Sequence, residues 1–254
     1  MNEITRVGVD LAKRVIQVHA VDASGRVVVA KALATDKFAA WCAQLPPGCL
    51  VAMEACGGAH HWARKLRGYG LDVRLIASNF VTPYRMAGKG SKNDAAHAAA
   101  ICEAAAHPHM RFVPIKTPAQ QALLAIHRLR KGYKQDRTAC INHIRGLLTE
   151  LGITFAQSPE ALRLGLADVL EDAGNELPGI TRLGLQEARL HWIELECHIA
   201  SCDERIAANV HTDAQAMAAA QLADIGPVTA SALMAIRHDK LNDIRRSPLL
   251  ATAE

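Results

Sequence analysis

KNDAAHAAAICEA, residues 92–104, is the segment on which the arrangement of the other elements depends. It is rich in alanine, and no Gly or Pro interrupts residues 91–107, so a helix is predicted there. A spacing of three residues puts Asp94 and His97 on one face of that helix. A carboxylate and an imidazole can both bind a metal, so the role of this pair depends on which residues lie opposite that face of the helix.

The residues before this helix predict a mixed sheet. Val7 and Val9 alternate with Gly8 and Asp10, which is the period of a half-buried strand. Further strands are predicted at 15–21, 26–30, 49–53 and 72–77, helices at 35–45 and 60–68, and a turn at 22–25. Residues 79–92 read as a polar loop near a site. Three strands followed by alternating helices and strands indicate an α/β fold with helices flanking the sheet.

The sequence changes character after Pro118, where long helical patterns begin. An apolar stripe continues for about 30 residues until Gly152, and residues 181–210 predict a second long helix antiparallel to the first. Together they predict a helical hairpin or coiled-coil arm. Ile225-Gly226-Pro227 leads into an alanine-rich helix and resembles half of a helix-hairpin-helix, whose N-terminus can take a phosphate.

Composition narrows the class of protein. The chain has 254 residues, of which 50% are hydrophobic and 21% charged, enough for a packed core and about two domains. No apolar run approaches the roughly 18 residues that span a bilayer, and residues 1–6 lack the apolar region of a signal peptide, so we expect a cytoplasmic protein. The seven cysteines are scattered without a Cys-x-x-Cys pair, so reduced thiols are expected rather than disulfides or a zinc site.

Positive charge is concentrated in the first long helix. Residues 111–153 hold eight Lys or Arg against two Asp or Glu, although the net charge of the whole chain is only +4. Such an excess can neutralise phosphates, and a solvated helix face is the alternative. The predicted nucleic-acid-binding residues are Arg128, Arg130, Lys131, Lys134, Arg137 and Arg145.

Three carboxylates far apart in sequence are candidates for one metal site. Asp10 ends the first strand, Glu54 ends the fourth, and Asp94 opens the later helix. The first and fourth strands of a mixed sheet can be neighbours, and a helix packed across them could bring Asp94 over both. Oxygen ligands of this kind suit Mg²⁺, and two such ions could clamp a phosphodiester exchange. Taken singly, an acid at the end of a strand, such as Asp10 or Glu54, is more often a cap or a surface residue than a metal ligand.

The sequence motifs around these acids resemble those of the insertion-sequence-110 family of transposases. The matching motifs are VGVDLAK at 7–13, MEACG at 53–57, HHWAR at 60–64, KNDAA at 92–96, QQ at 120–121, RLR at 128–130, RTA at 137–139, NHIRGLL at 142–148, ELGI at 150–153 and IGPVTA at 225–230. The resemblance implies a RuvC-like domain of the ribonuclease H fold with an Asp-Glu-Asp-Asp tetrad, of which Asp10, Glu54 and Asp94 match the first three members. It also implies Mg²⁺, a bridge RNA that pairs with donor and target DNA, and oligomers formed through the helical arm.

The chain departs from the family pattern in two places. His97 stands where the family has its fourth carboxylate, and a neutral or cationic imidazole would bind magnesium less well. The family's C-terminal domain carries a serine nucleophile, and we expect that domain to be truncated here, because Ser231 and Ser247 do not match the setting of that serine.

The leading hypothesis is a DNA transposase with a RuvC-like domain at 1–112, a coiled-coil arm at 113–212 and the start of a C-terminal domain at 213–254. Truncation and His97 are expected to impair it. One alternative is a non-catalytic nucleic-acid-binding or dimerisation protein that inhibits a full-length transposase, and another is a metal-dependent junction nuclease. The pairs His60-His61 and His107-x-His109 are candidate metal ligands, but they lack partners at a suitable spacing. Trp62 is expected in the core.

Overall fold

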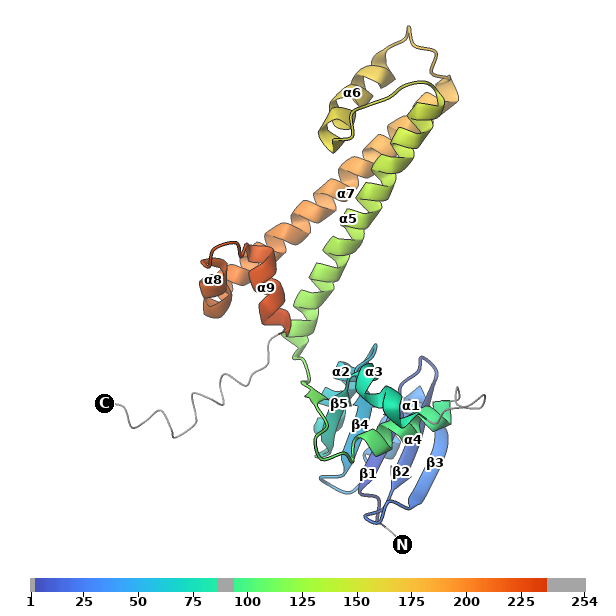
Figure 1. Ribbon diagram of the computed structural model, residues 1–254, viewed down its shortest axis with the longest axis vertical. Helices are drawn as coiled ribbons and strands as arrows, with labels where there is room; N and C mark the ends of the chain where they lie inside the picture. Colours follow the sequence, from blue (N-terminus) through green and yellow to red (C-terminus); the bar gives the residue numbers. More distant parts are fainter. Residues whose placement is uncertain (1–2, 86–93, 237–254) are drawn as a thin grey trace, which may run out of the picture. The chain divides into compact units, whose positions relative to one another are not determined.

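A six-stranded sheet forms the centre of the N-terminal unit (Figure 1). The computed structural model describes residues 3–85 and 94–236, and the chain divides into two compact units between Thr117 and Pro118. The strands are β1 (Arg6–Asp10), β2 (Val15–Val21), β3 (Val27–Ala34), β4 (Leu50–Glu54), β5 (Asp72–Ile76) and β6 (Phe112–Val113). Their spatial order is β3-β2-β1-β4-β5-β6, with β1, β4 and β5 parallel to one another and the other pairings antiparallel. The predicted mixed sheet, with its first and fourth strands adjacent, is confirmed.

Helices cover both faces of this sheet. Val7 and Val9 are fully buried in a cluster with residues of α1 (Thr35–Cys42) and α2 (Ala59–Arg67). The opposite face is covered by α4 (Asp94–Ala104), whose Ile101 packs with Ala52 of β4 and Ile76 of β5. The predicted α/β class with a ribonuclease H-like sheet and flanking helices is therefore confirmed.

Two details of this unit differ from the sequence-based expectation. The loop predicted at 79–92 begins instead with a short helix, α3 (Ser78–Val81), and a 3-10 turn, η1 (Thr82–Tyr84). Val81 is buried, the Thr82 hydroxyl donates to the Ser78 carbonyl at 2.9 Å, and Pro83 presets the backbone of the turn. Residues 86–93 of the predicted loop lie outside the described residues. Strand β6 was not predicted, because two residues are too short to show a period.

In its described part, residues 118–236, the second unit is a helical hairpin with three shorter helices. The helices are α5 (Pro118–Glu150), α6 (Pro159–Glu171), α7 (Gly179–Thr212), α8 (Ala214–Ala220) and α9 (Pro227–Ile236). Figure 1 shows α5 and α7 side by side, and their contacts run antiparallel, because Arg130 bonds Asp203 while Cys140 bonds the Ala188 carbonyl. The hairpin core adds leucines of α6 to the apolar residues of both long helices. The predicted arm and the helix after Gly226-Pro227 are confirmed.

Within the described ranges, no helix is both long enough and apolar enough to cross a lipid bilayer. The division into domains at residues 112 and 212 stays a prediction.

Candidate functional site

Asp10 and Glu54 meet because of the register between two parallel strands. Val9 of β1 lies beside Met53 of β4, so the next residue of each strand reaches the same edge of the sheet. The alternation that buries Val9 and Met53 under α1 and α2 turns Asp10 and Glu54 toward the other face, where α4 packs. The sequence-based expectation that these two carboxylates come together is confirmed.

Gly8 lets α4 approach this pair closely. A Cβ atom at Gly8 would collide with the Ala98 carbonyl oxygen and the Cys102 amide nitrogen of α4. Any larger residue would push the helix away from β1. Because α4 lies directly on Gly8, the helix turn just before Ala98 carries His97 over the ends of β1 and β4.

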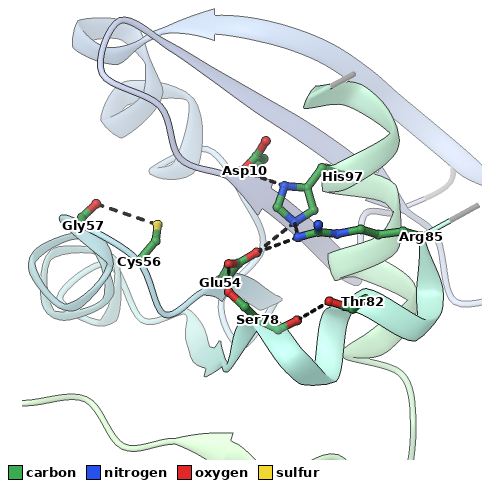
Figure 2. A network of polar contacts seen from close by, with 8 residues as sticks. All are labelled: Asp10, Glu54, Cys56, Gly57, Ser78, Thr82, Arg85 and His97. Carbon is green, nitrogen blue, oxygen red and sulfur yellow. Dashed lines mark hydrogen bonds and ion pairs between the residues drawn. The ribbon is translucent and has the colours of Figure 1, made fainter. Parts of the chain in front are cut away.

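His97 bridges the two carboxylates, as Figure 2 shows. Its Nδ1 lies 3.2 Å from Asp10 Oδ1, and its Nε2 lies 2.8 Å from Glu54 Oε2. The side chains of Asp10, Glu54 and His97 are only 16%, 14% and 21% exposed. Three elements that are distant in sequence thus hold one half-buried polar cluster, to which we refer as the carboxylate cluster.

Arg85 and Ser78 complete this cluster from the segment after β5. The Ser78 hydroxyl donates to Glu54 Oε1, and Arg85 Nη2 lies 3.4 Å from Glu54 Oε2 and 2.8 Å from His97 Nε2. Sequence reasoning missed both residues. The available signal for Arg85 was the polar loop predicted at 79–92, and Ser78 precedes that loop.

The contacts at His97 Nε2 exclude one another. Glu54 Oε2 only accepts a hydrogen bond, so that contact requires a proton on Nε2, whereas Arg85 only donates and requires a bare Nε2. With protons on both Nδ1 and Nε2, His97 donates to Asp10 and Glu54, and the imidazolium and Arg85 bring two positive charges to two carboxylates. With a proton on Nδ1 alone, His97 links Asp10 to Arg85, and Arg85 is the cation that faces Glu54.

The third predicted acid, Asp94, opens α4 one turn before His97. Its side chain lies outside the described part of the structure. Within the described residues, no group of three or more His, Cys, Asp or Glu side chains is arranged to hold a metal ion. Asp10 and Glu54 nevertheless offer the oxygen chemistry that suits one magnesium ion, and their convergence on a single imidazole shows that both reach a common point.

Cys56 follows Glu54 and lies at the edge of the same site (Figure 2). Burial, followed by the negative charges of Glu54 and Asp10, raises the pKa of its thiol. The thiol therefore stays protonated at neutral pH, which makes it a poor nucleophile.

The basic residues of α5 divide into two groups in the structure. Arg130 Nε donates to Asp203 of α7 at 2.5 Å, and Arg145 Nη2 donates to the carbonyls of Ala156 and Ser158 at 3.1 and 2.7 Å. These two arginines hold the hairpin and the segment before α6. Arg137 is half-buried.

Lys131 and Lys134 are exposed and border a cavity of about 640 Å³ along α5. Its other lining residues follow the same helical stripe and are His127, Arg130, Gln135, Thr138, Ala139 and Asn142. Arg128 is also exposed. Within the described ranges, the side chains of Lys131 and Lys134 form no ion pair, so their charge faces this open stripe.

The remaining candidates have structural roles. The Lys116 amide donates to His60 Nδ1 at 3.2 Å, and Trp62 packs edge-to-face on Phe38 in the core, as expected. Ser231 is fully buried and lies 3.0 Å from His127 Nε2. Ser247 lies outside the described residues.

Comparison with known proteins identifies relatives of this chain. Residues 7–153 match the model of a transposase family named for a DEDD motif and for the insertion sequence IS110. Over 237 residues, the chain is 44% identical to a "Probable family 20 transposase" of Pseudomonas aeruginosa and 36% identical to a "Putative transposase y4pF/y4sB" of Sinorhizobium fredii. It is 43% identical over 157 residues to the "Transposase for insertion sequence element IS1111A" of Coxiella burnetii.

These similarities cover 93%, 92% and 62% of this chain, and they span 69%, 59% and 42% of the three relatives in the same order. The family match includes Asp10, Glu54, Asp94 and His97 as well as the basic helix α5. The chain belongs to the insertion-sequence-110 family of DEDD transposases.

Proposed function

We propose that this chain acts in the transposition of an insertion sequence, binding DNA and supporting strand cleavage and joining at the carboxylate cluster. The observation that carries the proposal is the meeting of Asp10, Glu54 and His97 from β1, β4 and α4. The ends of these elements converge only because Gly8 admits α4 and the β1–β4 register aligns the acids. In a DEDD transposase, this is where acidic residues are expected.

Magnesium is the proposed cofactor, with Asp10, Glu54 and Asp94 as the residues that would hold it. A bound divalent ion stabilises the negative charge that develops on the oxygens of a phosphodiester during exchange. The chain's own residues do the positioning. Ser78 orients Glu54, and Arg85 offers a guanidinium next to the point where a phosphate would approach. His97 competes with a cation for both carboxylates, so we expect weak magnesium binding.

DNA, a bridge RNA and a second copy of the chain are the proposed partners. Lys131 and Lys134 support nucleic-acid binding, since they point to an open stripe rather than to an acid. Self-association through the arm is supported by exposed apolar residues on α7, among which Leu183 and Leu190 are one heptad apart and 64% exposed. Leu190→Glu should then lower the molar mass measured by light scattering.

Magnesium titration by calorimetry tests the catalytic proposal directly. The wild type is compared with His97→Asp, which restores a carboxylate at the fourth position, and with Asp10→Asn, which removes a ligand oxygen charge. We expect at least about tenfold tighter binding for His97→Asp, since removing the competing imidazole and adding a carboxylate act in the same direction. Equal affinities in the wild type and His97→Asp would refute the tetrad assignment.

A second function, nucleic-acid binding without catalysis, is favoured by one observation. Arg85 places a guanidinium against Glu54, and the His97 imidazole contacts both Asp10 and Glu54. On this view the cluster is a structural ion network. The two functions differ in outcome, because strand cleavage with magnesium that disappears in Asp10→Ala supports the transposase, whereas binding without any cleavage supports the alternative.

A further inference from the structure

A cavity of about 260 Å³ lies beside the carboxylate cluster in the N-terminal unit, and neither the family resemblance nor the proposed function assigns it a role. Its lining residues come from α3 and η1 on one side and from the segment after α4 on the other. They are Phe80, Pro83, Tyr84, His107, His109, Met110 and Arg111. Four rings, one thioether and one guanidinium therefore surround a small open space.

The rings form a connected series. Tyr84 and His107 lie 6.4 Å apart with an interplanar angle of 69°, and His107 and His109 lie 6.0 Å apart at 63°. Phe80 is 37% exposed. Ring edges and faces arranged in this way offer stacking surfaces to another flat aromatic group.

The polar groups of this cavity suit a nucleotide better than a metal ion. The His109 amide donates to His107 Nδ1 at 3.3 Å, which occupies that nitrogen and leaves the other ring nitrogen of His107 to carry the proton. His107 is then a hydrogen-bond donor toward a ligand. Arg111 adds a fixed positive charge on the same rim. Pockets that bind drug-sized ligands have volumes of about 300 Å³ or more. This cavity is slightly smaller, so it suits one base rather than a larger molecule.

The segment 78–85 contributes residues both to the cavity and to the carboxylate cluster. Ser78 and Arg85 contact Glu54, while Phe80, Pro83 and Tyr84, which lie between them in sequence, line the cavity.

We propose that this cavity takes one unstacked base of the DNA strand whose backbone lies at Asp10 and Glu54. The inference rests on the proposed DNA-directed function and adds a subsite to it. An extruded base would stack against the rings and accept a hydrogen bond from His107, while Arg111 pairs with the adjoining phosphate. Holding the base in this way fixes the register of the strand at the carboxylates.

Fluorescence anisotropy with the full chain in EDTA tests this subsite without cleavage. The probes are labelled duplexes of the same sequence that contain one extra central thymine, one extra central abasic residue, or neither. Both extra residues bend the duplex, so only the base distinguishes them. We expect the thymine probe to bind about fivefold or more tighter than the abasic probe.

Substitutions in the cavity test whether its residues cause the preference for the thymine probe. Phe80→Ala and His107→Ala should abolish the preference for thymine, and both side chains are exposed enough to be removed without loss of the fold. His107→Phe should retain most of it, because a stacking ring remains. Tyr69→Ala is the matched control, since Tyr69 is 38% exposed in the same unit and does not line the cavity.

The outcomes separate this inference from the function on which it rests. Equal binding of the thymine and abasic probes overturns the base subsite and leaves DNA binding intact. Absence of binding to all three probes overturns the proposed function and the subsite with it. Tighter binding of the same bulge in an RNA duplex than in DNA overturns the assignment to a DNA strand.

Discussion

The carboxylate cluster and the basic stripe of α5 hold their charges in opposite ways. In the cluster, Glu54 contacts His97, Arg85 and Ser78, so charge and hydrogen-bonding capacity are satisfied internally. On α5, Lys131 and Lys134 face an open cavity. A ligand must displace contacts at the first region, whereas at the second it meets charge that is already available.

This difference shows that the number of charges in a segment does not give the number available for binding. Of the six basic residues predicted to bind nucleic acid, Arg130 bonds a carboxylate and Arg145 bonds two carbonyls. Buried or half-buried guanidinium groups with such partners stabilise the hairpin.

The largest effect is expected for Gly8→Val, which destroys the geometry of the carboxylate cluster. The added side chain would collide with backbone atoms of α4, so the helix must shift away from β1. We expect the free energy of unfolding to fall by about 3 kcal/mol or more in urea titrations. Gly57→Ala is the control, because a Cβ there meets no atom within 4 Å and the change should be near neutral. Equal stability of both variants would contradict the close packing of α4.

A smaller loss is expected for Arg145→Ala, which tests structural charge on α5. Two carbonyls, of Ala156 and Ser158, lose their donor, and we expect about 1–2 kcal/mol of destabilisation. Arg128→Ala, at an exposed position of the same helix, should stay within about 0.5 kcal/mol of the wild type in the same urea titration. The comparison fails if Arg128→Ala is the more damaging change.

The fold was predictable from the sequence where the periods were long or strict. The alternation through Val7 and Val9 identified β1, and the apolar stripe that ends at Gly152 identified α5, because each pattern reports burial directly. The helical turn at residues 78–84 was not predictable, since its stability depends on burying Val81 and on a hydroxyl bond from Thr82. Tertiary contacts of that kind produce no periodic hydrophobic pattern in a segment of seven residues.

The sequence predicted the carboxylates of the site but not Arg85. Asp10 and Glu54 could be expected together, because both end strands that a mixed sheet can place side by side. Arg85 could not, as its position depends on where η1 ends rather than on any spacing from Glu54. Whether Asp94 joins them stays a prediction.

Lys134→Ala should change DNA binding and leave stability unaltered. Removing one available charge should weaken binding to a duplex by several fold at about 0.1 M salt, and it should reduce the slope of log affinity against log salt by about 1. Arg130→Gln is the contrasting variant, since Asp203 already compensates its charge, and its slope should change less. Binding curves at three or more salt concentrations measure both. Equal slopes for the two variants would remove the distinction between structural and available charge.

The smallest effect is expected at His127, which borders the basic stripe and contacts Ser231 of α9. Burial, followed by the charge of Arg130, lowers its pKa in the folded chain. The unfolded chain therefore binds more protons near pH 6.5, so this contribution to stability is complete above that pH and is lost as the pH falls through it. His127→Gln should flatten the corresponding part of the stability profile between about pH 8 and pH 5, measured by urea titration at each pH. A wild-type minus variant difference that is constant with pH would show that the hairpin does not couple these groups.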